Sequence, residues 1–267
     1  MGLSILNHEL LPSTETRRWM KPHGATESPS FLVGAPWEIN RLQIPVSAGS
    51  DRTRLMDLYT KMGANTGYGA GFALSPDHGL GYSLLSIGPH AVEDRFPLRD
   101  IVGSVFLPAA EAAAAENAAA NFVGTFADDK NGQTNLTIVV DDDHPGLRLT
   151  SLFEEGVDTR STVRASPVPP GAGYVVRLYP TNSSPATTLH SGTGDVRMAF
   201  RATRETLPLK THTEPAIGRG IFKDDCTSWF LAGFAEDIDE FVLNVVDGRL
   251  ESVTRSTSGA VFKRVRD

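Results

Sequence analysis

The block Tyr59-Thr60-Lys61-Met62-Gly63 has residue types whose spacing could serve a chemical reaction. Lys61 stands late in a predicted strand, where its ammonium would supply positive potential beside a reacting group. Gly63 follows two residues later, and its lack of a side chain would let a substrate lie close to the strand. Tyr68 opens the next predicted strand and is a weaker neighbour of the same site. The alternative is an exposed strand-end lysine followed by a turn glycine, because Lys-x-Gly is common by chance.

Other kinds of reactive site lack their sequence patterns. The seven histidines stand at least 12 residues apart, and none has the spacing of a metal-binding motif. Cys226 is the single cysteine, so an intrachain disulfide and a thiolate cluster are excluded, and a small buried hydrophobe is its ordinary role. Asp141-Asp142-Asp143 has the charge of a calcium loop without the rest of an EF-hand, and is better explained as a solvated turn. Neither a G-x-S-x-G elbow nor a P-loop is present. We therefore expect no metal and no cofactor.

The composition narrows the classes of partner. The 267 residues carry 25 Lys and Arg against 32 Asp and Glu, a formal net charge of −7. This acidity is mild and evenly spread, whereas proteins that bind nucleic acid or anionic membranes have clustered basic residues. The longest apolar stretches are far shorter than the ~20 residues that cross a bilayer. The sequence therefore predicts no nucleic-acid partner and no membrane partner.

The compartment stays open. Residues 1–11 lack the basic start and the apolar run of a secretory signal peptide. Sequons at Asn135 and Asn182 could take glycans in a secreted protein, but such triplets are common by chance.

The elements that must position Lys61 and Gly63 are strands and turns of the first half. Apolar and β-favouring patterns predict strands over residues 36–42, 55–61, 68–74 and 80–87. The last two form a hairpin whose turn, residues 75–79, ends in Gly79 at positive φ. The closely spaced glycines 67, 69 and 71 indicate a close backbone approach to their strand.

Two helices are predicted beside these strands. Ser13 is the expected N-cap of a short helix after Pro12. The segment over residues 98–122 is rich in alanine, the best helix former, and its small side chains would let the helix pack closely on a sheet. We expect Pro108 to kink or restart this helix. An acidic low-complexity linker is the alternative for the alanine-rich part.

From residue 121 onward the pattern is strand and turn. About eight short strands, spaced by about ten residues, indicate an antiparallel barrel or sandwich. The predicted strands cover residues 122–126, 136–140, 146–153, 157–165, 174–179, 196–204, 221–229, 241–246 and part of 253–265. A domain boundary near residue 120 follows.

Several blocks in the same order resemble a known family, the fungal β-lactamase-related (penicillin-binding-protein-like) serine hydrolases. The similar blocks are Val33-Gly34-Ala35-Pro36-Trp37-Glu38-Ile39, the Tyr59 to Gly63 block, Gly67-Tyr68 and Ala73-Leu74-Ser75-Pro76-Asp77. The resemblance implies an α+β chain. Residues 1–120 would be the C-terminal part of a β-lactamase-like transpeptidase domain, a partial antiparallel sheet with a packed helix. Residues 121–267 would be an antiparallel lipocalin-like β-barrel domain.

The sequence departs from this family at the catalytic residues. The family uses a nucleophilic Ser in Ser-x-x-Lys, a Tyr-x-Asn or Ser-x-Asn element, and Lys-Thr-Gly. The first two are absent here, and the third survives as Lys61-Met62-Gly63. Met62 replaces a threonine whose hydroxyl could bind a substrate carboxylate. Because a serine needs an adjacent base to react, the family's acyl-enzyme route cannot run on this sequence. We expect either a truncated hydrolase, which we favour, or a scaffold that has lost or changed its chemistry.

The resemblance implies hydrolysis or transfer of an amide, lactam or ester acyl group, with Lys61 and Gly63 in one wall of the site and Tyr68 beside them. One alternative is a non-catalytic barrel over residues 121–267 that binds a small molecule or docks a partner. Another is a repurposed non-hydrolytic scaffold in fungal secondary metabolism. Without the family's covering strands the sheet would expose an edge and a face. We therefore expect it to form a homo-oligomer there or to be poorly ordered.

Overall fold

A computed structural model describes residues 1–46, 51, 53–141, 146–163, 173–181, 196–207 and 240–265. Four residues discussed above, and one predicted strand, lie outside them: Asp142, Asp143, Asn182, Cys226 and residues 221–229. The chain divides into two compact units, one over Met1–Glu116 and one over Asn117–Asp141 and the described residues from Gly146 onward. The sequence predicts this boundary near residue 120.

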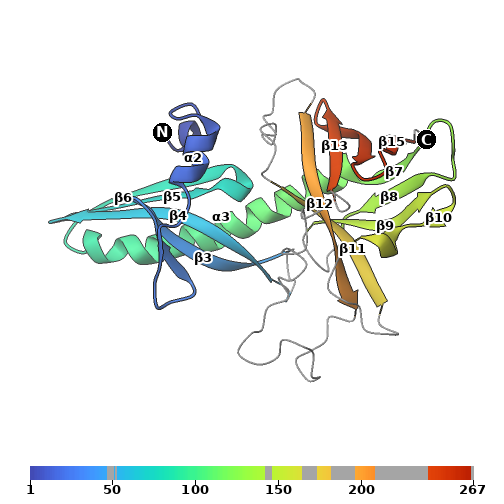
Figure 1. Ribbon diagram of the computed structural model, residues 1–267. Coiled ribbons are helices and arrows are strands. Elements are labelled where there is room, and N and C mark those ends of the chain that lie inside the picture. Colours follow the sequence, from blue (N-terminus) through green and yellow to red (C-terminus); the bar gives the residue numbers. More distant parts are fainter. Residues whose placement is uncertain are drawn as a thin grey trace. The chain divides into compact units, whose positions relative to one another are not determined.

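The first unit is built on a six-stranded antiparallel sheet in which each strand pairs with the next one along the chain (Figure 1). Two short helices precede the sheet along the chain, and a long helix, α3, follows it. The bounds are α1 Gly2–Leu6, α2 Ser13–Trp19, β1 Gly24–Ala25, β2 Phe31–Val33, β3 Glu38–Pro45, β4 Thr53–Asn65, β5 Tyr68–Ser75, β6 Leu80–Ile87 and α3 Ala91–Phe122. The four strands predicted in this half are confirmed as β3 to β6.

The hairpin between β5 and β6 closes through a short 3-10 helix, Pro76–His78, and Gly79. Gly79 has φ 63°, the positive value that the turn pattern predicts. The predicted cap of α2 is wrong. Ser13 is the first residue of the helix and Pro12 is its N-cap. Pro12, at φ −52° and ψ 149°, already has the extended conformation of a cap residue, so the helix begins at Ser13 itself.

One face of the sheet packs on the N-terminal segments. Trp37, Ile39 and Leu74 form a buried cluster with Ile5 of α1 and Met20, which follows α2. Side chains alternate between the two faces of a strand, so the neighbouring positions point to the other side.

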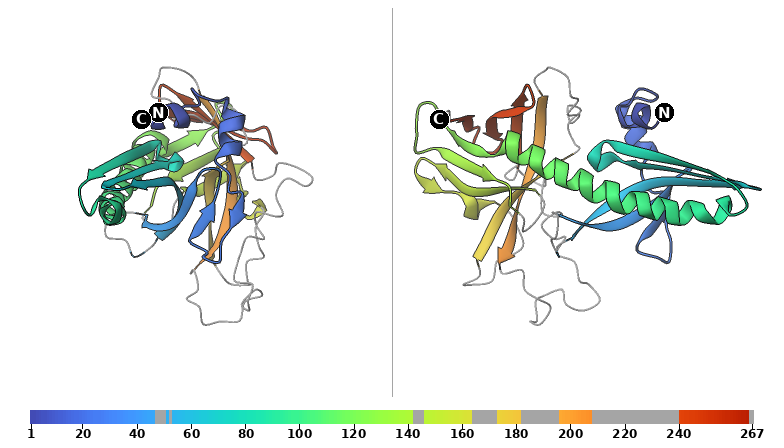
Figure 2. Two further views of the ribbon diagram at one scale, coloured as in Figure 1. Left: turned by 90° about the vertical axis from the view of Figure 1, so that its left-hand side faces the viewer. Right: turned by 180° about the vertical axis from the view of Figure 1, so that it is seen from behind.

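The opposite face packs on α3. Met56, Leu58 and Ala73 form a second buried cluster with Ile44 and with Leu107 of the helix. Figure 2 shows α3 running along this face of the sheet. Both faces are therefore covered near the centre of the sheet.

Helix α3 starts earlier than predicted, at Ala91, and continues through both Pro97 and Pro108. The predicted restart at Pro108 does not occur, although the helix over residues 98–122 is confirmed. Ala91 is buried, and its carbonyl oxygen lies close against the backbone of Gly69 in β5. This packing holds the first turn of the helix against the sheet, ahead of both prolines. The predicted close approach at Gly69 is confirmed.

The described residues of the second unit form an antiparallel barrel of eight strands, in the order β9-β11-β12-β13-β14-β15-β7-β8, closed by pairing between β8 and β9. A two-residue strand, β10, pairs with β9 alongside this ring. The bounds are β7 Gly124–Ala127, β8 Asn135–Val139, β9 Leu147–Glu154, β10 Val157–Asp158, β11 Gly173–Pro180, β12 Val196–Leu207, β13 Glu240–Val246, β14 Arg249–Arg255 and β15 Val261–Arg264. The α+β fold class, with a packed sheet followed by an antiparallel barrel, is confirmed.

One predicted strand of this half is wrong. Instead of a strand over residues 157–165, β10 ends at Asp158 and a 3-10 helix covers Arg160–Thr162. The Asp158 carboxylate accepts hydrogen bonds from the backbone and the guanidinium of Arg160, each at 3.0 Å. Such local side-chain bonds offer the backbone an alternative to strand pairing.

The barrel is filled by its own side chains. The inward positions carry large apolar residues that are completely buried, among them Phe126, Leu152, Leu178, Phe241 and Phe262. A ligand in this barrel would therefore have to bind away from this core. Among the described residues, no helix is both long and apolar enough to span a membrane.

Candidate functional site

Lys61, Gly63 and Tyr68 lie at one end of the first sheet. Lys61 and Gly63 are two residues apart on β4, and Tyr68 is the first residue of β5. In the strand register, Gly63 pairs with Ala70 and Asn65 pairs with Tyr68, so these side chains share the face on which Lys61 lies.

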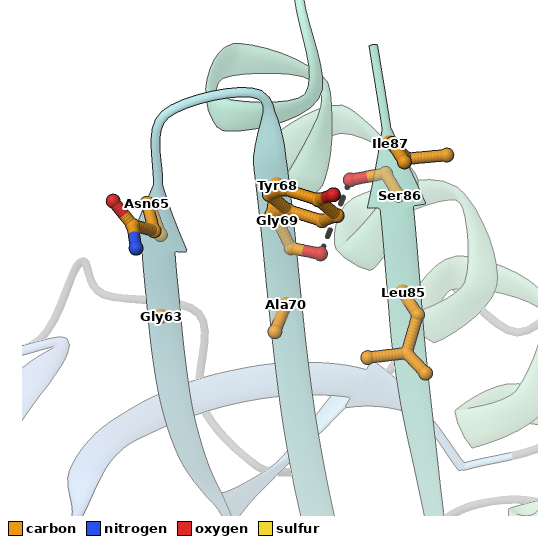
Figure 3. A pocket seen from close by; sticks show the side chains of 9 residues that line it. Gly63, Asn65, Tyr68, Gly69, Ala70, Leu85, Ser86 and Ile87 are labelled. Carbon is orange, nitrogen blue, oxygen red and sulfur yellow. Dashed lines mark hydrogen bonds between the residues drawn. The ribbon is translucent and has the colours of Figure 1, made fainter.

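Gly63 and Tyr68 line a shallow surface hollow of about 450 Å³, and Lys61 stands next to it without lining it. Three neighbouring strands supply the lining (Figure 3). Its principal residues are Gly63, Asn65, Tyr68, Ala70, Leu85 and Ile87. The structure thus brings Gly63 and Tyr68 together and adds two apolar side chains of β6 that the sequence pattern did not single out.

Lys61 is held by Glu38, the first residue of β3. Its ammonium forms an ion pair with Glu38 Oε1 and also donates to the carbonyl of Met62 at 2.9 Å. The second carboxylate oxygen, Oε2, accepts the backbone N–H of Met62 at 3.2 Å. Glu38 therefore bridges the side chain and the backbone of the Lys-Met-Gly segment.

Among the described residues, no strand pairs with the edge of β4 beyond Thr60, although the N–H and C=O of Met62 on this edge are bonded to the side chains of Glu38 and Lys61. Pairing between β3 and β4 runs only as far as Glu38 opposite Thr60. From Lys61 to Asn65, β4 has β5 on one side and no strand on the other among the described residues. A strand with an open edge presents backbone N–H and C=O groups to whatever lies beside it.

Met62 does not face the hollow. A Cβ placed on Gly71 of β5 would stand 3.2 Å from Met62 Sδ, so the Met62 side chain packs on the opposite face of the sheet from Lys61. Met62 stands where the resembled family has the threonine of Lys-Thr-Gly. In place of a hydroxyl it has a thioether, which is directed away from Lys61.

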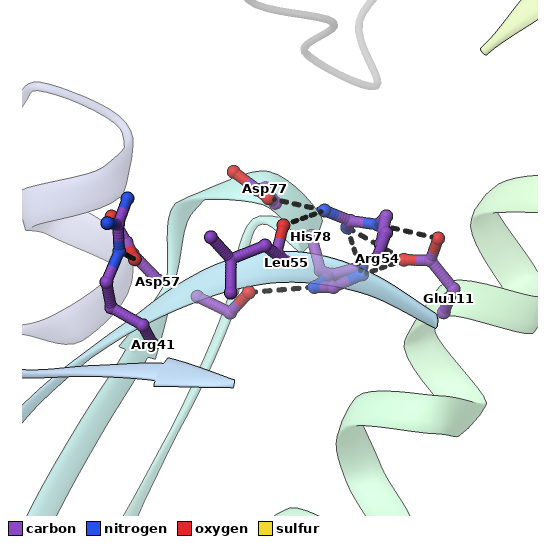
Figure 4. Close-up of polar contacts among 8 residues, drawn as sticks. Arg41, Arg54, Leu55, Asp57, Asp77, His78 and Glu111 are labelled. Carbon is purple, nitrogen blue, oxygen red and sulfur yellow. Dashed lines mark hydrogen bonds and ion pairs between the residues drawn. The ribbon is translucent and has the colours of Figure 1, made fainter. Parts of the chain in front are cut away.

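A second polar cluster joins the sheet to α3 and was missed by sequence reasoning (Figure 4). His78 Nε2 lies 2.7 Å from Glu111 Oε2, and His78 Nδ1 lies 2.7 Å from the hydroxyl of Ser75. Arg54 donates two hydrogen bonds of 2.8 Å to the Glu111 carboxylate and one of 2.9 Å to Asp77. No local pattern could have revealed this cluster, because Glu111 is distant in sequence from its partners.

The proton positions in this cluster follow from the partners. A carboxylate only accepts hydrogen bonds, so His78 Nε2 carries a proton that it donates to Glu111. Burial alone would raise the pKa of Glu111, but the hydrogen bonds from His78 and Arg54 and their charges lower the pKa to about 2.

Ser75, His78 and Glu111 contact one another in the order of a serine nucleophile, its base and a carboxylate. Because the side chains of Ser75 and His78 are buried, they cannot act on a substrate. Ser75 is completely buried, and only 2 % of the His78 side chain is exposed. The Glu111 carboxylate is shared with Arg54, which holds it in place from the sheet. The cluster therefore fastens α3 to the sheet and presents no reactive group to a substrate.

Among the described residues, no group of three or more His, Cys, Asp or Glu side chains could hold a metal ion. Asp141, the first residue of the acidic run, instead forms ion pairs with Arg148 and Arg177, at 3.0 and 2.8 Å.

Comparison with known proteins gives matches along most of the chain. A family described as "Beta-lactamase-like-like, C-terminal domain" matches residues 114–266. A beta-lactamase-like protein of Arthroderma benhamiae is 26 % identical over 269 aligned residues, which cover 93 % of this chain and 44 % of that protein. A probable hydrolase of Cochliobolus lunatus is 26 % identical over 175 residues, covering 61 % of this chain and 26 % of its own length.

Among solved structures, a penicillin-binding protein homologue from Pyrococcus abyssi matches 97 % of this chain and 44 % of its own, with 12 % identity and a TM-score of 0.26. The chain thus spans less than half the length of each of these proteins.

Proposed function

This chain belongs to the beta-lactamase-like C-terminal-domain family, whose model matches residues 114–266, and we propose its function from that premise. The match and the fungal relatives establish a family-level relation to hydrolases. Within that relation, the proposal is that the first unit forms one wall of a site for hydrolysis or transfer of an amide, lactam or ester acyl group.

The observation that carries this proposal is the position of Lys61 and Gly63 at the edge of β4 beyond Thr60, with which no described strand pairs. A substrate could lie along this edge, because β3 no longer pairs there and Gly63 has no side chain to obstruct it. Lys61 and Glu38 place an ion pair at this edge, and Glu38 also bonds the strand backbone at Met62. Groups fixed beside a reacting carbonyl before the reaction are the main source of electrostatic stabilisation in such sites.

The nucleophile and its base have to come from residues outside these 267. The sequence has no Ser-x-x-Lys, Tyr-x-Asn or Ser-x-Asn. Ser75 has a histidine beside it, but it is completely buried. A serine without an accessible base is a weak nucleophile at neutral pH. The 267 residues by themselves are therefore catalytically incomplete in this proposal.

The first test uses the chain alone. A fluorophosphonate probe and a chromogenic β-lactam are incubated with the purified 267-residue protein. We expect neither covalent labelling nor turnover. A labelled serine identified by mass spectrometry would overturn the proposal, because the nucleophile would then lie within this sequence.

The second test restores the remainder of the site. The chain is joined to the part of the Arthroderma benhamiae protein that it does not match, and the fusion is checked for folding by circular dichroism. We expect probe labelling of the fusion, reduced about tenfold in rate by Lys61→Ala, because Glu38 would then stand uncompensated beside the developing negative charge. Lys130→Ala, an exposed lysine of the second unit, is the matched control. A folded fusion whose labelling is insensitive to Lys61→Ala would contradict the role given to β4.

A further inference from the structure

We propose that the hollow beside Lys61 binds uncharged, apolar acyl esters in preference to compounds that carry a carboxylate. This inference rests on the proposed function and names the substrate class of the same site. Two independent features carry it: the charge of Lys61 is already paired, and the lining of the hollow is apolar and uncharged.

The pairing of Lys61 leaves no free cation for a substrate carboxylate. Glu38 receives the Lys61 ammonium on one oxygen and the Met62 N–H on the other. Because Glu38 opens β3 and its backbone is paired with Thr60, its carboxylate is held at this edge. The half-exposed ion pair adds little stability. The pair is neutral overall, but an incoming carboxylate would have to compete with Glu38 for the Lys61 ammonium, and two like charges at one ammonium repel.

The residue between Lys61 and Gly63 gives no help to an anion. A hydroxyl at this position could donate a hydrogen bond to a carboxylate, but Met62 has none. Its side chain packs near Gly71 on the other face of the sheet, so it cannot be turned toward the hollow without disturbing that packing.

The lining favours an apolar group. Tyr68, Leu85 and Ile87 are 57, 86 and 75 % exposed and stand side by side on the ends of β5 and β6, as Figure 3 shows. No charged side chain belongs to the lining. Its volume of about 450 Å³ lies within the usual range for small-molecule sites, which are mostly apolar with a few polar groups. Asn65 and the Tyr68 hydroxyl supply such polar groups for an ester carbonyl.

The experiment compares two probes that differ in charge, methyl hexanoate and hexanoate. Each is titrated into the isotope-labelled 267-residue chain and followed by amide chemical shifts in NMR spectra. We expect methyl hexanoate to shift signals of Gly63, Asn65, Tyr68, Leu85 and Ile87, and to bind about tenfold more tightly than hexanoate, a difference of about 1.4 kcal/mol.

Two variants separate the two features. Leu85→Asp should weaken the binding of methyl hexanoate about tenfold, whereas Ile101→Asp, at another exposed apolar position on α3, should leave that binding unchanged. Glu38→Gln removes the repelling charge and frees Lys61, so hexanoate should gain about tenfold while methyl hexanoate changes little.

The inference would be overturned if the unaltered chain bound hexanoate as tightly as methyl hexanoate. It would also be overturned if Leu85→Asp left the binding of methyl hexanoate unchanged. Neither readout requires turnover. If the chain binds methyl hexanoate but the folded fusion is not labelled by the probe, only the proposed function is contradicted. A fusion that labels normally but prefers hexanoate contradicts only this inference.

Discussion

At the scale of single residues, the protonation of Glu111 is tied to the fold. It lies on α3, while its partners come from β4 and from the turn after β5. Its pKa is about 2 in the folded chain, against an ordinary value of 4.5. A carboxyl group whose pKa is lowered by folding stabilises the fold above its ordinary pKa. This contribution is complete above about pH 4.5 and is lost as the pH falls toward 2.

We expect Glu111→Gln to lower the free energy of unfolding by about 1–3 kcal/mol at pH 7, because Arg54 and His78 would lose their charged partner. The difference between variant and unaltered chain should shrink as the pH falls from 5 toward 3. Urea unfolding followed by tryptophan fluorescence measures the loss at pH 7 and its change with pH, since Trp19 and Trp37 lie in this unit. Glu116→Gln, an exposed position of the same helix, should have no such effect. A loss that is equally large at pH 3 would contradict the ionic explanation.

At the scale of elements, the contact between β5 and the start of α3 depends on Gly69. A Cβ at this position would stand inside the contact distance of the Ala91 carbonyl and 2.6 Å from Ser86 Oγ. Ser86 Oγ also donates to that carbonyl, at 3.0 Å. Because backbone cannot move aside as a flexible side chain can, the helix would have to shift if any other residue stood here.

Gly69→Ala should therefore destabilise the first unit by about 2–4 kcal/mol, measured by urea unfolding. Gly63→Ala in the neighbouring strand is the control, because its Cβ would meet only Ala70 Cβ, at an ordinary 3.9 Å. Its stability should be unchanged or slightly higher, since alanine loses less backbone entropy than glycine. If both variants were equally stable, the close approach at Gly69 would not be decisive.

At the scale of the whole molecule, the first sheet ends differently at its two edges. The edge strand β1 has only two residues, whereas β6 at the other edge has eight. The sequence of β6, Leu80 to Ile87, contains no charge and no proline. Long, uncharged edge strands pair readily with another chain, and proteins usually shorten or charge them to prevent it. Association of the chain through the first sheet remains a prediction from the sequence, and we propose that it occurs at the β6 edge.

Size-exclusion chromatography with light scattering should accordingly show concentration-dependent association of the 267-residue chain. Ser83→Lys, an exposed position of β6, should shift the protein toward the monomer, because a lysine on an edge strand disfavours pairing. Ser104→Lys, exposed on α3, adds the same charge away from the edge and should not. A compact monomer at all concentrations would contradict the prediction.

The sequence by itself determined most of the described strands, the hairpin turn at Gly79, the close approach at Gly69 and an antiparallel barrel or sandwich after residue 120. These follow from local causes: side-chain alternation, turn chemistry and the conformational range of glycine. It also singled out Lys61 and Gly63 as candidate site residues, because strand-end position and spacing can be read locally, and their role stays a prediction.

Only the tertiary structure decided which distant groups meet. It paired Lys61 with Glu38, placed Leu85 and Ile87 in the same hollow as Gly63, and brought Glu111 to His78 and Arg54. The start of α3 at Ala91 and the end of β10 at Asp158 were likewise set by packing and by side-chain hydrogen bonds. Charge pairing and burial depend on separation in space, and residues far apart in the sequence carry no periodic signal of their future contact.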